Sequence, residues 1–140
     1  MSQVPAPASG AAAATDTPYA QLGGEAALRA LVDRFYDLMD LEPAYAGIRA
    51  LHAPELESAR EKLFMFLSGW LGGPSLYIAR HGHPRLRARH LPYAIGVAER
   101  DQWLACMEQA MSECGVPDTL RRRLAQAFFE TADFMRNRPG

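Results

Sequence analysis

The sequence predicts a single domain built only from α-helices, and three observations lead to this prediction. Apolar residues recur at the spacing of a buried helix face in four long stretches, glycine and proline separate these stretches, and no stretch alternates polar with apolar residues as a half-buried strand would. With 140 residues, of which 49% are hydrophobic, the chain is long enough for one core and too short to expect two.

The first helical region covers residues 19–40, YAQLGGEAALRALVDRFYDLMD. It predicts a short helix, a break at Gly23 and Gly24, and a longer helix with one buried face. Tyr36 lies next to this buried face. The buried face consists of Leu28, Leu31, Val32, Phe35, Leu38 and Met39. Residues 42–56 contain two prolines and a glycine, so we expect a connecting region with short turns only.

A third helix is predicted from about residue 54 to residue 71 and is ended by Gly72, Gly73 and Pro74; its apolar stripe is Leu63, Phe66, Leu67, Trp70 and Leu71. Glycines and prolines interrupt residues 75–97, yet PRLRARHL between two prolines can form about two helical turns. Helices then follow over residues 98–114 and 118–136, the last with a face of Leu120, Leu124, Phe128, Thr131 and Met135.

The composition argues against several classes of protein. A formal net charge of −1 does not favour a protein that binds nucleic acid or acidic membranes over its whole surface. No run of about 18 apolar residues predicts a membrane span. Cys106 and Cys114 are the only cysteines and form no CxxC motif, so we expect free thiols, no disulfide framework and no thiolate zinc site, as in the reducing cytoplasm.

The N-terminal residues 1–18 are rich in alanine and proline. They lack the basic start and leucine-rich stretch of a signal peptide, which predicts a disordered extension. The folded domain is therefore expected to cover residues 19–140.

His90 is the first candidate for a functional residue. It lies on the short helix between two prolines, which gives the side chain a fixed direction. One neutral imidazole suffices to hold haem iron, whereas a structural zinc ion needs four ligands. The alternative is a histidine at the surface or at a helix cap, so the neighbouring residues have to distinguish the two interpretations.

A local excess of positive charge surrounds His90. No acidic residue occurs between Glu61 and Glu99, a stretch that contains Lys62, Arg80, Arg85, Arg87 and Arg89. The two propionates of haem would pair with such cations, as would phosphate or nucleic acid, and a solvated cationic face is a further alternative.

Large aromatic side chains are abundant, and most are expected to form the core. Tyr36 and Trp103 differ because each has a polar hydrogen that needs a partner when the ring is buried. In an apolar pocket both could donate to a bound diatomic ligand.

Five motifs occur together in one order: GGE, DRFY, FLSGWLGGP, HGHPRLRARHLPYAI and RDQWLACM. On these motifs the chain resembles the truncated haemoglobins, within them the bacterial type of group II, from Tyr19 to Arg138. The resemblance implies a two-over-two helical sandwich around haem b, with a shortened proximal helix.

Position by position, the resemblance implies that His90 is the proximal iron ligand and that Tyr36 and Trp103 stabilise a distal ligand. His52 matches a position that faces the haem in relatives, although Leu51 competes for the same place in the alignment. For the propionates, Lys62 and Arg89 are the implied partners.

Further haem contacts are implied for one residue at the distal gate, Ala59, and for Leu63, Phe66, Tyr77, Leu86 and Tyr93. Tyr77 is also a third candidate for a propionate. His81 and His83 do not share a helix face, and a role in stabilising their loop is expected instead of a second metal site.

These implied roles predict a haem protein that binds O2, and also NO and CO, with high affinity and slow release. Slow release suits chemistry on the ligand, either nitric oxide dioxygenation or peroxide reduction, with electrons from an external reductase. A non-catalytic protein for oxygen storage or sensing is the alternative, and a helical module that binds anions or nucleic acid is a remoter one. A monomer and a homodimer both fit.

Overall fold

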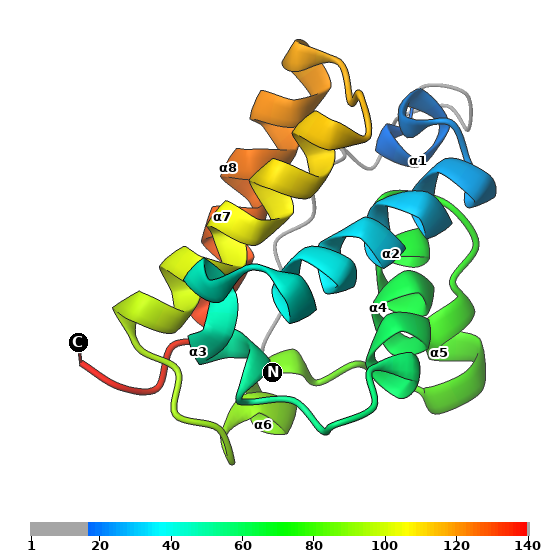
Figure 1. Cartoon of the computed structure of the whole chain (residues 1–140). Coiled ribbons are helices and arrows are strands. Elements are labelled where there is room, and N and C mark those ends of the chain that lie inside the picture. Colours follow the sequence, from blue (N-terminus) through cyan, green and yellow to red (C-terminus); the bar gives the residue numbers. More distant parts are fainter. Residues whose placement is uncertain (1–16, 140) are drawn as a thin grey trace.

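The computed structural model describes residues 17–139, and all regular elements within them are helices (Figure 1). The predicted all-α fold is therefore confirmed. In chain order the elements are α1 (Pro18–Leu22), α2 (Glu25–Leu41), the 3-10 turn η2 (Pro43–Tyr45), α3 (Ala46–Arg49), α4 (Glu57–Trp70), α5 (Leu76–His81), α6 (Leu86–His90), α7 (Val97–Glu113) and α8 (Asp118–Phe134).

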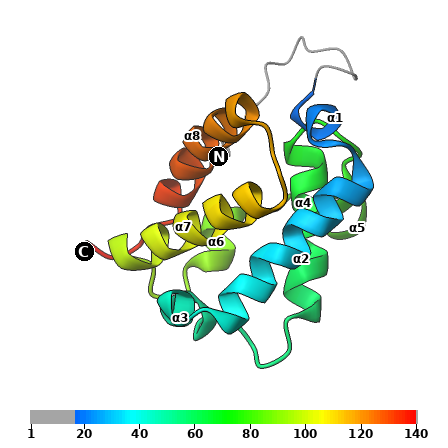
Figure 2. The same cartoon turned by 45° about the horizontal axis from the view of Figure 1, so that its top comes forward.

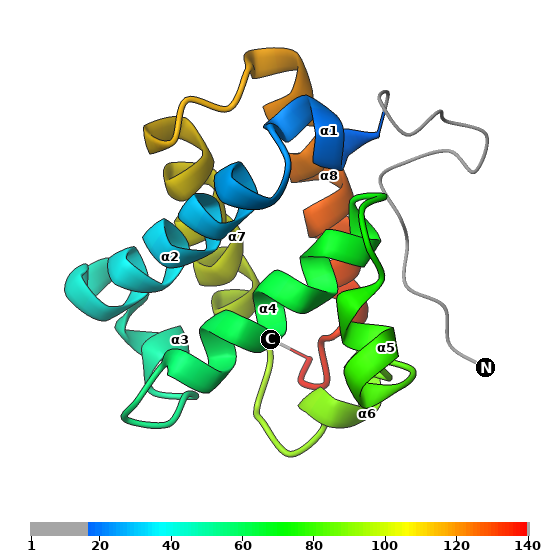
Figure 3. The same cartoon turned by 90° about the vertical axis from the view of Figure 1, so that its right-hand side faces the viewer.

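Four long helices form two packed pairs. α2 packs on α4, α7 packs on α8, and α2 also contacts α7, so the pairs form the two layers of a sandwich (Figures 1 and 2). The apolar faces predicted for α2 and α8 are buried between these layers. The short helices α3 and α6 lie at one end of the sandwich in Figure 1, and Figure 3 shows α5 and α6 at the same end of the molecule.

Thr17 and Pro18, which the prediction assigned to the N-terminal extension, belong to the described structure. Thr17 is buried and its hydroxyl accepts a hydrogen bond from the Ala20 N–H at 3.1 Å, while Pro18 occupies the first turn of α1. Residues 1–16, most of the extension expected to be disordered, lie outside the described residues.

Two helices differ from their predicted bounds. α4 begins at Glu57 and not near residue 54, because the guanidinium of Arg49 donates to the carbonyls of Ala53 and Pro54 and holds that stretch outside the helix. α5 was not predicted, since its six residues are too few to show a periodic pattern. Leu63 and Phe66, placed on the buried stripe of α4, are only partly buried.

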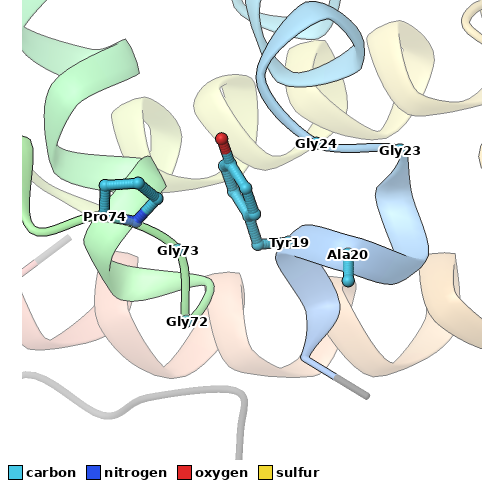
Figure 4. Close-up of a pocket in the computed structure, with 7 residues that line it drawn as sticks. All are labelled: Tyr19, Ala20, Gly23, Gly24, Gly72, Gly73 and Pro74. Atoms are coloured by element: carbon cyan, nitrogen blue, oxygen red, sulfur yellow. The ribbon is translucent and has the colours of Figure 1, made fainter. Parts of the chain in front are cut away.

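The corner between α1 and α2 packs against the loop that follows α4. Tyr19, Ala20, Gly23, Gly24, Gly72, Gly73 and Pro74 line a cavity of about 600 Å³ there (Figure 4). A Cβ atom on Gly73 would lie 2.6 Å from the ring of Tyr19, so this close approach requires glycine.

We therefore expect Gly73→Ala to lower the free energy of unfolding by about 1–3 kcal/mol, as overpacking does. Chemical denaturation measures this change. In a Tyr19→Ala background the same substitution should cost much less, because the ring that it meets is gone. Equal costs in the two backgrounds would show that the contact with Tyr19 does not decide the preference for glycine.

Both cysteines are free, as predicted. Cys106 is buried and its thiol lies 3.2 Å from the carbonyl oxygen of Phe35, whereas Cys114 is exposed. No helix of the described part is long and apolar enough to cross a membrane.

Candidate functional site

His90 lies at the end of α6 with one ring nitrogen engaged and one free. Its Nδ1 is 2.6 Å from the carbonyl oxygen of Leu86. Because a carbonyl only accepts, this hydrogen bond places the proton on Nδ1 and leaves a lone pair on Nε2. A neutral histidine in this tautomer is suited to bind iron through Nε2. Histidines that bind metals usually donate a hydrogen bond from their other ring nitrogen, as Nδ1 does here.

The loop before α6 directs this short helix. Pro84 is buried, and its carbonyl accepts a hydrogen bond from Nε of Arg89 at 2.8 Å. Arg85 has a left-handed backbone with φ of 48°, and its N–H donates to Nδ1 of His83 at 3.1 Å. His83 therefore has the role in stabilising the loop that was expected for it.

His52 follows α3 and has the same tautomer. Its Nδ1 lies 2.8 Å from the carbonyl oxygen of Ile48, so in the neutral ring Nε2 accepts hydrogen bonds and does not donate them. Burial lowers the pKa of the imidazole, the hydrogen bond to Ile48 opposes this change, and the charges of Arg49 and His90 lower the pKa further.

Tyr36 on α2 presents an unpaired hydroxyl from a buried ring. The residue is only 5% exposed, and its ring packs edge-to-face against Phe35 at 5.0 Å and against His52 at 5.8 Å between centroids. Its hydroxyl has no hydrogen-bond partner within residues 17–139. Burial raises the pKa of the phenol and outweighs the opposing effect of the Arg60 cation, so the group stays protonated and can donate.

Trp103 on α7 is the second unpaired donor. Its ring lies 5.1 Å from Phe35 and 5.4 Å from Phe128 between centroids. The indole N–H makes no hydrogen bond to the part of the chain that the structure describes. The start of α7 is fixed by the N–H of Gly96, which donates to the Glu99 carboxylate at 2.7 Å, two turns before Trp103.

Ring contacts connect these side chains to α4 and α5. Beyond Phe128 the series continues through Trp70 at 5.0 Å, Phe66 at 6.3 Å and Tyr77 at 6.5 Å between successive centroids. The contacts run without a break from His52 to Tyr77 and form an aromatic wall. Ala59 and Leu63, one turn apart on α4, pack against the same core.

The remaining predicted residues lie on α4, on α6 and in the loop after it. Lys62 and Arg89 are exposed, and neither forms an ion pair with a described carboxylate. Leu86 is half-buried, and Tyr93 is 44% exposed with its ring 6.5 Å from that of His90. A free Nε2, two unpaired donors and two unpaired cations are together a donor set that fits haem and its propionates.

Sequence reasoning missed Asn137, which lies after α8. Its side-chain amide donates to the carbonyls of His90 at 3.3 Å and Tyr93 at 2.8 Å, and its Oδ1 accepts from the N–H of Ile95 at 2.9 Å. Its own N–H donates to the carbonyl of Ile95 at 2.8 Å. The end of the chain therefore holds the loop that follows His90, an arrangement that no local pattern could reveal.

We expect Asn137→Ala to loosen this loop and to speed the loss of haem by up to about tenfold, as the loss of outer-shell support does. Transfer of haem to an acceptor protein measures the rate. Resonance Raman of the ferrous protein should also show a shifted iron–histidine stretching band. Asn137→Asp keeps an acceptor for Ile95 but places a carboxylate oxygen against the two carbonyls, so it should speed haem loss at least as much. An unchanged band in both variants would contradict the role of Asn137.

Gln102 and Arg60 were also missed. Gln102, next to Trp103, accepts the N–H of Ile48 at 3.1 Å and so ties α3, and with it His52, to α7. Arg60 on α4 bonds the carboxylates of Asp33 and Asp37 on α2 at 3.2 and 2.7 Å, which fixes the crossing of α2 and α4 near Tyr36. The spacing of four residues between the two aspartates was the only available signal.

The two-layer helical sandwich, together with a donor set that fits haem, indicates a class of protein: the small helical haem proteins. Residues 17–137 match the bacterial-like globin family, and the chain belongs to this family.

The similar proteins are group II truncated haemoglobins. Group 2 truncated hemoglobin YjbI of Bacillus subtilis is 38% identical over 122 residues, which cover 87% of this chain and 89% of that protein. The structure of the Group II 2-on-2 hemoglobin of Agrobacterium tumefaciens is 42% identical with a TM-score of 0.84 and covers 93% of this chain and 98% of that one.

A structure described as the truncated oxygen-avid haemoglobin of Bacillus subtilis is 39% identical, with a TM-score of 0.79, and covers 86% of this chain and 99% of that one. The predicted family and the two-over-two fold are thus confirmed. Membership of the globins and these relatives support binding of haem and of oxygen.

Proposed function

We propose that this protein holds haem b through Nε2 of His90 and binds dioxygen with high affinity and slow release, as a step in nitric oxide dioxygenation or peroxide reduction. The observation that carries this proposal is the pair of unpaired donors, the Tyr36 hydroxyl and the Trp103 N–H, within one aromatic wall. The ring of Tyr36 is buried and that of Trp103 is half-buried, and two donors without a protein partner on one wall support a ligand that accepts from both. The name of the oxygen-avid relative agrees with this interpretation.

When bound, haem supplies an iron that binds diatomic gases such as O2, NO and CO and exchanges electrons with them or with peroxide. The side chains set what happens to such a ligand. Tyr36 and Trp103 donate to an acceptor that carries partial negative charge, and such bonds are stronger where water is excluded. The rings of Phe35 and Phe128 exclude water behind both donors.

For His52 we propose a positioning role at neutral pH in place of the donor role expected from the resemblance. In the neutral tautomer its Nε2 accepts, so it does not stabilise the negative end of a ligand at neutral pH. Its edge-to-face contact with the Tyr36 ring orients the phenol instead. Lys62 and Arg89 would hold the propionates, and Tyr77 on α5 is the third candidate.

Slow release disfavours bulk oxygen transport and favours chemistry on the bound gas. Nitric oxide dioxygenation joins NO and O2 into nitrate, and returning the ferric haem to the ferrous state takes one electron from an external reductase. Storage or sensing of oxygen without chemistry is the second candidate, and the two differ in whether nitrate forms.

The test is to reconstitute the purified chain with haem, to equilibrate the ferrous protein with dioxygen, and to mix it with NO in a stopped-flow spectrometer. We expect stoichiometric haem, slow dissociation of O2, and rapid conversion to the ferric spectrum with an equimolar amount of nitrate. Replacing NO with hydrogen peroxide tests the peroxidase alternative. Slow dissociation without nitrate or peroxide turnover would leave storage or sensing, and a protein that takes up no haem would refute the proposal.

A further inference from the structure

We infer that a cationic face formed by Lys62, Arg80, Arg85, Arg87 and Arg89 docks an acidic one-electron carrier protein of the ferredoxin or flavodoxin type, which reduces the haem. The inference rests on the proposed function, because it names the partner that would supply the electron. The reduced carrier loses one electron, the ferric haem becomes ferrous, and no bond is made or broken.

The first observation is the segregation of charge along the chain. Residues 62–98 hold five basic and no acidic side chains, a net charge of +5. The rest of the chain holds 10 basic and 16 acidic side chains, a net charge of −6. A nearly neutral protein therefore has one strongly positive region, and two haem propionates would neutralise less than half of it.

The second observation is that these cations are unpaired. Elsewhere seven arginines form ion pairs with carboxylates: Arg29, Arg34, Arg49, Arg60, Arg100, Arg121 and Arg136. Within residues 17–139 none of the five cations of the cationic face has such a partner. Arg87 and Arg89 bond only backbone carbonyls, at 3.3 and 2.8 Å. Their charge is therefore available to an approaching anion.

The third observation is where the charge lies. Arg80, Arg85 and Arg89 are exposed on α5, at the start of α6 and on α6, and α6 ends at His90 (Figure 3). His81 and His83, also exposed, add no negative charge. Three cations of this face therefore lie at the end of the molecule that holds α6, the element that would bind the iron.

This placement favours an acidic electron carrier over nucleic acid. Opposite charges on two proteins steer their encounter and raise the association rate by roughly 10-fold to 1000-fold. Plant-type ferredoxins have reduction potentials low enough to reduce a ferric haem. Nucleic acid could bind to the same cations, but its binding would not explain their position near a redox centre. In addition, α6 has only five residues, which is short for a helix that recognises bases in the major groove.

The test mixes the ferric holoprotein under CO with a reduced acidic plant-type [2Fe–2S] ferredoxin and follows the ferrous CO spectrum. We expect the reduction rate to fall by about tenfold or more between 10 mM and 150 mM salt, since the Debye length shortens from about 30 Å to about 8 Å. Reduction by neutral lumiflavin semiquinone should show little change. Calorimetric titration of oxidised ferredoxin into the ferric protein measures binding without turnover.

Charge reversal at one residue locates the contact. Arg80→Glu should slow reduction by ferredoxin and weaken its binding by about threefold or more at 10 mM salt. Arg122→Glu is the matched control, because it reverses an equally exposed arginine on α8, outside the cationic face. Equal effects of the two variants, or no dependence on salt, would overturn the inference.

Tighter binding of duplex DNA than of ferredoxin would reassign the cationic face to nucleic acid. Haem content and O2 dissociation are measured on the same samples. If haem content and O2 dissociation are normal but Arg80→Glu and Arg122→Glu are reduced by ferredoxin at the same rate, only the docking surface is refuted. A wild-type protein that binds no haem would refute the proposed function.

Discussion

His90→Ala is expected to abolish stable haem binding. The substitution removes the free Nε2 lone pair, and no other described residue offers an imidazole on α6. The loss should exceed the roughly 10–100-fold that removal of an outer-shell partner costs. Titration of the apoprotein with haem, followed by the Soret band, measures the affinity.

Two controls separate ligation from folding. His81→Ala removes an exposed histidine at the end of α5, outside the loop that directs α6, and should retain most haem affinity. Imidazole added to His90→Ala should restore a six- or five-coordinate haem spectrum, because it replaces the missing ligand. It would not correct a folding defect, so rescue shows that ligation was lost. Normal haem content and an unchanged spectrum in His90→Ala would disprove the assignment.

Tyr36→Phe is expected to speed the release of dioxygen by roughly tenfold to a hundredfold, the equivalent of losing a hydrogen bond of about 1.5–3 kcal/mol to a partly charged acceptor. Phenylalanine keeps the ring contacts with Phe35 and His52 and removes only the hydroxyl, which has no partner among residues 17–139. Displacement of O2 by CO in a stopped-flow spectrometer gives the rate.

Two further variants apportion the effect. Trp103→Phe removes the indole N–H and should also speed release, whereas His52→Phe should change the rate much less at pH 7.5, because the neutral ring does not donate from Nε2. The lowered pKa of His52 keeps it neutral at pH 7.5, and protonation well below pH 6.5 would turn it into a donor that slows release. A large effect of His52→Phe with none of Tyr36→Phe would reverse these assignments.

Much of the fold was predictable because helix periodicity is local. The faces of α2 and α8 are buried as predicted, and breaks at Gly23, Gly24 and Gly72 fall where backbone angles with positive φ end a helix. The start of α4 was not predictable, because the hydrogen bonds of Arg49 to Ala53 and Pro54 set it. The existence of α5 was not predictable, because six residues are too few to show a periodic pattern.

The candidate site divides in the same way. The residue types at His90, Tyr36 and Trp103 and their order in the chain pointed to a haem protein before any contact was known. The residues that hold these side chains in place were not predictable, because Asn137 is 47 residues from His90 in sequence and Gln102 is 54 from Ile48. Separations of this size leave no periodic trace.

Residue type and spacing are enough to predict the helical class, the buried faces of α2 and α8 and the charge segregation, and the five motifs carry the resemblance to the globin family. Which polar groups are paired depends instead on how the helices pack. This packing brings Nδ1 of His52 and of His90 to backbone carbonyls, leaves the Tyr36 hydroxyl and Trp103 N–H without partners among the described residues, and anchors the loop after His90 on Asn137. A hydrogen bond depends on positions to within tenths of an ångström, and these positions exist only once the layers have packed.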